Sequence, residues 1–97
     1  MLIAKVIGTT VSTIKDERLS GRKLLIVRQT DEYGSLQGKP FVAVDTVDAG
    51  VGELVLTCSG SSARQTDQTK DSPVDAVIMA IIDSLEVEGQ NVFRKSA

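Results

Sequence analysis

Residues 2–14, LIAKVIGTTVSTI, set the fold class, because most of their side chains are Val, Ile or Thr. Branching at Cβ restricts χ1 rotation in a helix and suits a pleated strand, so this stretch predicts a β-strand. The next apolar run, LLIV at 24–27, is continuous between Lys23 and Arg28. Such a run is typical of a strand that is covered on both faces.

Further short strands are predicted downstream. They lie at 41–47, 54–58 and 91–94, and the last is either a final strand or an arm onto a neighbouring subunit. Glycine and polar residues dominate the segments between the strands and predict loops and turns, at 16–22, 31–40, 48–52 and 88–90. A small polar stretch, SGSSARQTDQTKDS at 59–72, adds a longer excursion.

Residues 73–87 fit two structures equally well. Their apolar side chains recur at helical spacing, and Ser72 followed by Pro73 resembles a helix N-cap with proline at the first helical position. The central side chains are β-branched, however, and also alternate as the two apolar faces of a strand. Periodicity alone therefore leaves both a helix and a strand open.

Several short strands at this spacing, in a chain of 97 residues, predict one all-β domain with a small Greek-key or OB-like barrel. Barrel closure removes free strand edges and leaves the rim loops available for contacts with other subunits. A chain of this length buries only about 60–65% of its unfolded surface when it folds alone. We therefore expect partner subunits to contribute to its stability.

The composition excludes most simple enzymes. The chain has no His and a single cysteine, Cys58, so a zinc cluster, a disulfide framework and His-based catalytic dyads or triads are excluded within one chain. Cys58 lies in an apolar run and is expected to be a small buried hydrophobic residue. Paired carboxylates are not distinctive among 13 acidic residues, and most are expected to be solvated: Asp45 with Asp48, and Asp75 with Asp83.

Charge and aromatic content argue against nucleic-acid and membrane partners. The net charge is −2, with 11 basic and 13 acidic residues and no long block of either sign. Three aromatic side chains are too few for the stacking surfaces that bind single strands. The N-terminus lacks a cleavage signature, and the longest apolar run, 76–82, is too short to cross a bilayer, so we expect a cytoplasmic location.

The segment AGVGE at 49–53 contains two glycines but not the GKS or GKT of a phosphate-binding loop. A tight turn between strands is the better interpretation. Gly50 and Gly52 would then supply a positive φ or a close backbone approach. Such a turn suits a place where several copies of a backbone converge on an axis.

The segment GSSAR at 60–64 brings two hydroxyl groups and a guanidinium close to a glycine. Ser61 or Ser62 would need a base to act as a nucleophile; no His exists to supply it, and nothing in the sequence supports a Lys in that role. We favour a loop that forms hydrogen bonds between subunits, in which Arg64 pairs with a carboxylate or carbonyl of a neighbour.

The sequence as a whole resembles the EutN/CcmL family of bacterial microcompartment vertex proteins. Four blocks, in order, carry the resemblance: KVIGTTVSTIKDERLSGRKLLIVR (5–28), VAVDTVDAGVGELVL (42–56), GSSARQT (60–66) and PVDAVIMAIID (73–83). Together they span nearly the whole chain, 1–97, as a single domain of this type.

The resemblance implies a five-stranded OB-like barrel with a short helical turn, assembling as a homopentamer. Such pentamers close the corners of protein shells in the bacterial cytoplasm, in contact with hexameric shell proteins and without a cofactor or metal. It also implies that 76–87 is a strand, that Ser61, Ser62 and Arg64 lie near the subunit interface, and that the pore or axis loop is formed by Asp48, Ala49, Gly50, Val51, Gly52 and Glu53. The family often has glycine where this chain has Asp48.

Two other functions remain open at this point. An OB-like barrel could be a binding module for an oligonucleotide or another polymer, by analogy of fold alone. An enzyme with a site between subunits, around Arg64 and Glu53, has the least support. A structural shell protein that is not an enzyme is the interpretation that we carry forward.

Overall fold

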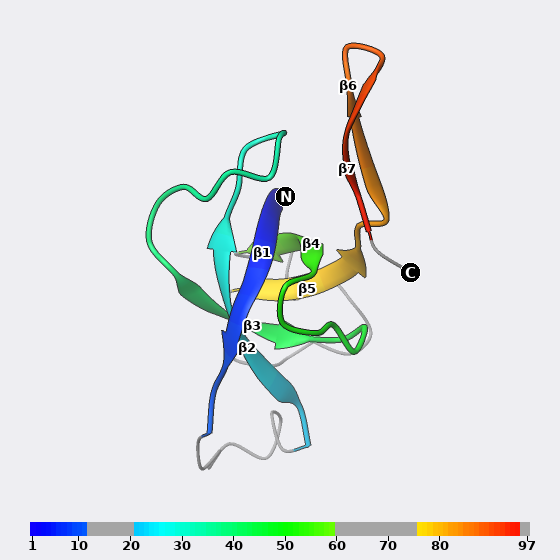
Figure 1. Ribbon diagram of the computed structural model, residues 1–97. Helices are drawn as coiled ribbons and strands as arrows, with labels where there is room; N and C mark the ends of the chain where they lie inside the picture. The colour runs from blue at the N-terminus through cyan, green and yellow to red at the C-terminus, as the bar shows by residue number, and fades with distance from the viewer. Residues whose placement is uncertain (12–20, 60–75, 96–97) are drawn as a thin grey trace.

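Five strands close into a barrel, and two more form a separate hairpin (Figure 1). The computed structural model describes residues 1–11, 21–59 and 76–95, and every statement below concerns these residues. The barrel strands are β1 (Leu2–Thr9), β2 (Lys23–Gln29), β3 (Phe41–Asp45), β4 (Leu54–Ser59) and β5 (Ala76–Ile81). The hairpin strands are β6 (Ser84–Val87) and β7 (Gln90–Arg94).

The barrel order is β1-β2-β3-β5-β4, and β1 also pairs with β4, which closes the sheet. All neighbours are antiparallel except β3 and β5. This is the OB-like five-stranded barrel that the resemblance implies. The short helical turn in that expectation does not fall within the described ranges.

Side chains alternate between inward and outward positions along the strands, and the inward ones form the core. Ala4 and Val6 of β1, Leu25 and Val27 of β2 and Val55 of β4 point into the barrel and are no more than 1% exposed. The outward neighbours Leu24 and Ile26 are only half-buried. The prediction that β2 is covered on both faces is therefore wrong for the single subunit, since β2 has one buried face.

Strand bounds differ from the sequence expectations at two ends. The first strand stops at Thr9, ahead of the predicted end at residue 14, and residues 12–14 lie outside the described part. The third strand stops at Asp45 and not at residue 47, because the Asp45 side chain accepts hydrogen bonds from the following backbone. The side chain competes there with ladder pairing.

The ambiguous segment is a strand at 76–81, as the family resemblance implies, and not a helix. It is not one continuous strand to residue 87, however, because the chain leaves the barrel at Ile82 and Asp83 and begins β6 at Ser84. The Ile82 N–H donates to the Leu54 carbonyl at 2.8 Å, which ends the barrel ladder at that point. The predicted turn is confirmed at Glu88 and Gly89, which have positive φ, while Gln90 already belongs to β7.

Two other expectations can be compared with the described residues. Cys58 is 5% exposed and packs with Val44 and Val77, as predicted for a small buried hydrophobic residue. The segment 31–40 is a loop, in which the Asp31 carboxylate accepts the N–H groups of Tyr33 and Ser35. None of the described residues belongs to a helix long and apolar enough to span a membrane.

A matched pair of Val→Ala substitutions tests the position of the core. Val55 is 0% exposed and Val11 is 103% exposed, so only the first substitution removes buried methyl groups and leaves a cavity. We expect Val55→Ala to lower the free energy of unfolding by about 2 kcal/mol, measured by urea denaturation at a fixed subunit concentration. Val11→Ala should change it by less than about 0.5 kcal/mol. Equal losses from both variants would contradict the assigned core.

Candidate functional site

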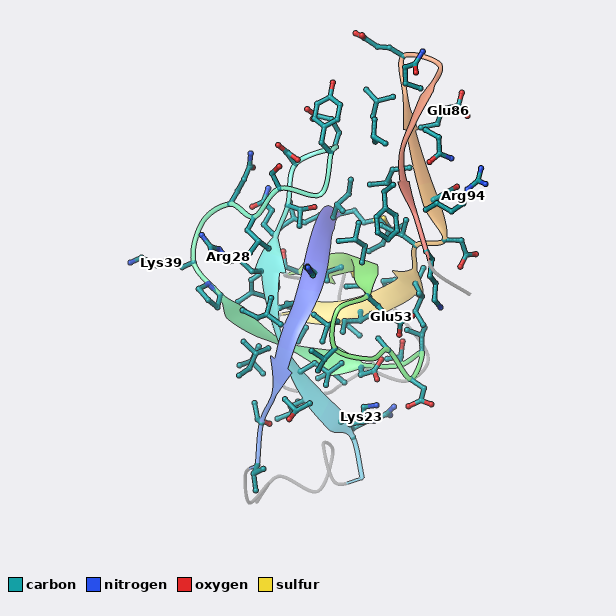
Figure 2. The ribbon with its side chains drawn as sticks, viewed as in Figure 1. Lys23, Arg28, Lys39, Glu53, Glu86 and Arg94 are labelled. Atoms are coloured by element: carbon teal, nitrogen blue, oxygen red, sulfur yellow. The ribbon has the colours of Figure 1, made fainter. Side chains whose placement is uncertain are left out.

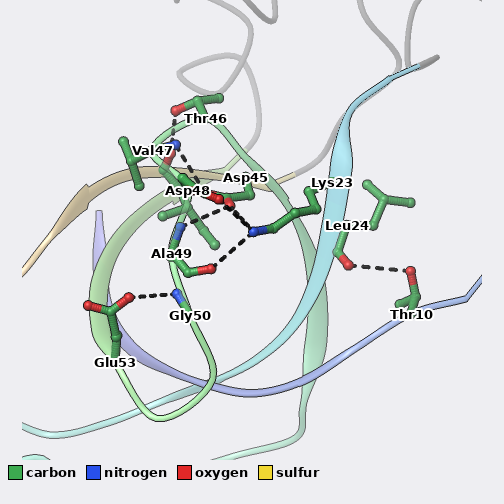
Figure 3. Close-up of polar contacts among 11 residues, drawn as sticks. Thr10, Lys23, Leu24, Asp45, Thr46, Val47, Asp48, Ala49, Gly50 and Glu53 are labelled. Atoms are coloured by element: carbon green, nitrogen blue, oxygen red, sulfur yellow. Dashed lines mark hydrogen bonds and ion pairs between the residues drawn. The ribbon is translucent and has the colours of Figure 1, made fainter.

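The loop between β3 and β4 contains the predicted axis residues, and it starts from a buried carboxylate. Asp45, the last residue of β3, is 8% exposed. Its two oxygens accept the backbone N–H groups of Val47 and Ala49, each at 3.0 Å (Figure 3). The expectation that the pair Asp45 and Asp48 would be mostly solvated is therefore wrong for Asp45, which fixes the first turn of the loop.

Lys23, at the start of β2, lies opposite Asp45 in the β2–β3 pairing, and its side chain extends to this turn (Figure 3). Its ammonium lies 2.9 Å from Asp48 Oδ1 and 3.4 Å from Asp45 Oδ2, and donates to the Ala49 carbonyl at 3.4 Å. The hydrogen bond between the Lys23 and Asp48 side chains raises the pKa of Lys23 and lowers the pKa of Asp48. One cation thus links two carboxylates and a backbone carbonyl.

Asp48 occupies the left-handed region of backbone space, with φ of 57°. Glycine adopts this conformation without penalty, and Asp and Asn tolerate it better than other residues with a Cβ. Asp48 therefore fits this turn better than most residues with a Cβ would. Its carboxylate side chain is 94% exposed.

The second half of the loop is a tight turn closed by Glu53. The Gly50 N–H donates to Glu53 Oε1 at 2.6 Å, and the Glu53 N–H donates to the Gly50 carbonyl at 3.2 Å. A Cβ on Gly50 would lie 3.2 Å from Glu53 Oε1, and Gly52 has φ of 93°. The predicted positive φ is present at Gly52, whereas the near neighbour of Gly50 is the end of the Glu53 side chain.

Two backbone hydrogen bonds tie the loop back to β1 just after its tip. The Gly52 N–H donates to the Val6 carbonyl at 2.8 Å, and the Val6 N–H donates to the Glu53 carbonyl at 2.9 Å. Ala49 is 1% exposed and packs in the core, whereas Val51 at the tip is 62% exposed. The loop is therefore a firmly held rim feature that presents a small apolar tip to its surroundings.

Glu53 also connects the loop to the end of the chain. Lys95, which follows β7, lies 2.7 Å from Glu53 Oε2. This ion pair, with the Gly50 N–H, lowers the pKa of Glu53, and the same pair raises the pKa of Lys95. A general acid needs a carboxyl pKa raised toward neutrality, and the shift here has the opposite sign.

The arrangement has the chemistry of a structural support. Each carboxylate of the loop is held by an ammonium group or by backbone N–H groups. Among the residues that the structure describes, no group of His, Cys, Asp and Glu side chains could hold a metal ion. Ser61, Ser62 and Arg64, predicted at the interface, lie outside the described residues, as does Asp75.

Sequence reasoning missed three supporting residues: Asp45 in its buried role, Lys23 and Lys95. Lys23 and Asp48 are 25 positions apart, and no local spacing signals a pair at that distance. The available hint was that Lys23 directly precedes a predicted strand and would lie at the same barrel rim as a turn that follows another strand. That inference needs the strand order, which composition and periodicity do not supply.

The described part of the chain is a closed OB-like barrel whose rim-loop carboxylates are held by ammonium or backbone N–H groups. The sequence profile of the family described as "Ethanolamine utilisation protein EutN/carboxysome" matches residues 1–83. The chain belongs to this EutN/CcmL family.

Individual relatives agree with the family assignment. The chain is 47% identical over 95 residues to the carboxysome shell vertex protein CcmL of Synechococcus elongatus, covering 98% of this chain and 96% of that protein. It is 42% identical to the microcompartment shell vertex protein EutN of Escherichia coli, over 98% of this chain and 100% of that protein. The solved structure of GrpN, a pentameric microcompartment shell protein from Rhodospirillum rubrum, has a TM-score of 0.80 and 48% identity, covering 90% and 99% of the two chains.

Three substitutions at residue 48 test the backbone interpretation. Asp48→Gly and Asp48→Asn both suit a φ of 57°, so their melting temperatures should stay within a few degrees of the wild type. Asp48→Val places a β-branched residue there and should lower Tm by roughly 5–10 °C. Thermal melts at matched subunit concentration provide the measurement. A Val variant as stable as the Asn variant would show that the turn does not require the left-handed conformation.

The Glu53–Lys95 pair predicts a pH dependence of stability. The pKa of Glu53 is lowered from its ordinary value near 4.5, so its stabilising effect is complete above that pH and is lost as pH falls through the folded-state pKa. The difference in Tm between the wild type and Glu53→Gln should therefore shrink as pH falls from neutrality to about 3. Lys95→Met removes the cation, so in that background the effect of Glu53→Gln on Tm should also be smaller. A constant difference across this range would contradict the ion pair.

Proposed function

We propose that this chain forms a homopentamer that caps the five-fold vertices of a bacterial microcompartment shell, with a structural and not an enzymatic role. The observation that supports this most directly is the family membership together with the likeness to the pentameric GrpN structure, at a TM-score of 0.80 over 90% of the chain. The paired charges of the rim loop agree with a scaffold role. The protein would thus be located in a microcompartment shell in the bacterial cytoplasm.

The mechanism is geometric. A layer of six-fold tiles is flat, and replacing a six-fold tile by a five-fold one forces curvature, so a closed polyhedron needs pentamers at its corners. Subunits around a rotation axis use a heterologous contact, in which one patch of each subunit meets a different patch of the next. The angle between these two patches in the barrel would determine that the ring closes at five.

The loop Asp48–Glu53 is our candidate for the axis of the ring. Its tip carries a 62% exposed Val51, and the hydrogen bonds to Val6 hold the loop in one shape that several copies could share. The exposed Asp48 carboxylate would then be repeated once per subunit near the pore. Ser61, Ser62 and Arg64 are proposed to form hydrogen bonds across the subunit interface.

Hexameric shell proteins are the proposed neighbours of the pentamer, because vertices are surrounded by six-fold tiles. Nucleic acid and membranes are not proposed as partners. The net charge of −2 and the absence of a block of positive charge support this choice.

Oligomer mass and shell shape test the proposal. Native mass spectrometry should give a mass of five subunits under gentle conditions, and a stable monomer would count against a vertex role. Shells assembled without this subunit should be open or elongated under the electron microscope. The control is a strain in which every other vertex homologue is also removed, and compact, sealed shells in that strain would contradict a capping role.

A further inference from the structure

The outer wall of the barrel carries two positive charges that face each other across neighbouring strands. In the β1–β2 pairing, Lys5 is the register partner of Arg28. Their strand neighbours Ala4, Val6 and Val27 are fully buried in the core. Because side chains alternate along a strand, Lys5 and Arg28 both point to the outside. Like charges directly opposite each other in an antiparallel pair destabilise a sheet, so this pair is unfavourable for the fold of the isolated subunit.

A third cation lies beside this pair. Arg28 Nε donates to the Gly38 carbonyl at 2.9 Å, which brings the next residue, Lys39, close to the guanidinium. Figure 2 shows Arg28 and Lys39 on the same side of the barrel, with Lys39 extending away from it. Lys39 is exposed, whereas Lys5 and Arg28 are half-buried. We call Lys5, Arg28 and Lys39 the cationic patch.

No carboxylate of the described ranges 1–11, 21–59 and 76–95 neutralises the cationic patch. Within these ranges, neither the Lys5 nor the Lys39 ammonium has an ion-pair or hydrogen-bond partner. The Arg28 guanidinium has one partner, and it is the backbone carbonyl of Gly38. The patch therefore differs from the rim loop, where Lys23 and Lys95 each hold a carboxylate of the same subunit.

The Arg28 guanidinium is held in an orientation that suits an anion. Its Nε is occupied by the Gly38 carbonyl, so the two terminal nitrogens remain available at the far end of the group. These nitrogens form a planar fork that matches the two oxygens of a carboxylate. A side chain that is already fixed by one hydrogen bond loses less conformational freedom when it binds a partner.

Exposed apolar side chains border the cationic patch. Ile7 follows Lys5 on β1 and is 38% exposed. Val42 of β3 is 49% exposed and is the register partner of Ile26, which precedes Arg28 on the outward face of β2. Arginine among apolar side chains is typical of the central part of a protein–protein interface. The outer wall of a barrel is convex and does not enclose a small anion, which favours a protein partner.

We propose that the cationic patch, together with Ile7 and Val42, is a docking surface for an acidic segment of a partner protein. Arg28 binds one carboxylate of that segment through its terminal nitrogens, and Lys5 and Lys39 hold neighbouring carboxylates. The apolar side chains pack against the hydrocarbon part of the segment. This inference goes beyond the vertex role, because the contact is not one between copies around the ring.

Amine labelling of the assembled protein tests whether the patch is accessible. A lysine-directed N-hydroxysuccinimide ester, followed by peptide mass spectrometry, should modify both Lys5 and Lys39 in the pentamer. The denatured protein gives the reference extent of reaction for each lysine. If either lysine reacts in the denatured protein but not in the pentamer, the ring itself covers the patch and the inference is overturned.

Binding to an acidic probe peptide tests the chemistry of the patch. The probe is a short dye-labelled peptide of glutamate and leucine, titrated with the pentamer and followed by fluorescence anisotropy. Arg28→Gln should raise Kd by at least about fivefold, and Arg28→Lys, which keeps the charge but loses the fork, by about threefold. The matched control, Arg94→Gln, removes the same charge from the β6–β7 hairpin and should change Kd by less than about twofold. Far-UV circular dichroism checks that each variant folds.

Three results of this titration would overturn the inference. Equal losses from Arg28→Gln and Arg94→Gln would mean that only net charge matters. Equally tight binding of a peptide with glutamine in place of glutamate would mean that carboxylates are not recognised. Equally tight binding of a single-stranded oligothymidylate would mean that the surface does not select a protein segment. Each of these results leaves the vertex role intact as long as native mass spectrometry still finds a pentamer.

The stability of a Lys5 variant separates docking from a role in the fold. Lys5→Met keeps the aliphatic stem and removes the charge that faces Arg28, so Tm should be equal to or higher than that of the wild type. The same variant should bind the acidic peptide more weakly. A lower Tm with unchanged peptide affinity would show that the cation supports the fold, and would overturn the inference.

Discussion

The pairing of β1 with both β2 and β4 is the constraint on which the rest of the structure depends. It closes the sheet, so inward side chains of all five barrel strands share one core with no free strand edge. It also positions Val6, whose backbone holds the rim loop through Gly52 and Glu53. The same closure places Leu54 where it can bond Ile82 and direct the chain out of the barrel. Core, loop and hairpin are therefore set by one backbone arrangement.

In the described part of this molecule, charged side chains hold the rim loop in one conformation. Lys23 links Asp45 and Asp48 at one end of the rim loop, and Lys95 holds Glu53 at the other. Exposed ion pairs contribute little to stability on their own, so their value here lies in fixing the conformation of a loop. The lowered pKa values of Asp48 and Glu53 move both groups further from the neutral range in which a carboxyl can exchange protons, which agrees with a supporting role.

Local chemistry explains which features were predictable from the sequence. The β-branched stretch at 2–14 predicted a strand, and the glycines at 50 and 52 predicted a tight turn, because both signals act over a few residues. The helix or strand ambiguity at 73–87 could not be resolved by periodicity, since the outcome depends on whether 76–81 pairs with β3 and β4. The Lys23 and Lys95 contacts and the buried state of Asp45 required the strand order as well. The family resemblance implied the barrel and a strand at 76–87, but it gave no strand order and missed the break after Ile81.

Residue 48 has a consequence for how such proteins diversify. Asp codons and two of the glycine codons differ by a single base, and both residues fit the backbone at φ of 57°. One mutation can thus add or remove a carboxylate per subunit at the rim without rebuilding the turn. The electrostatic character of this rim can therefore change by single mutations while the barrel and its turn stay the same.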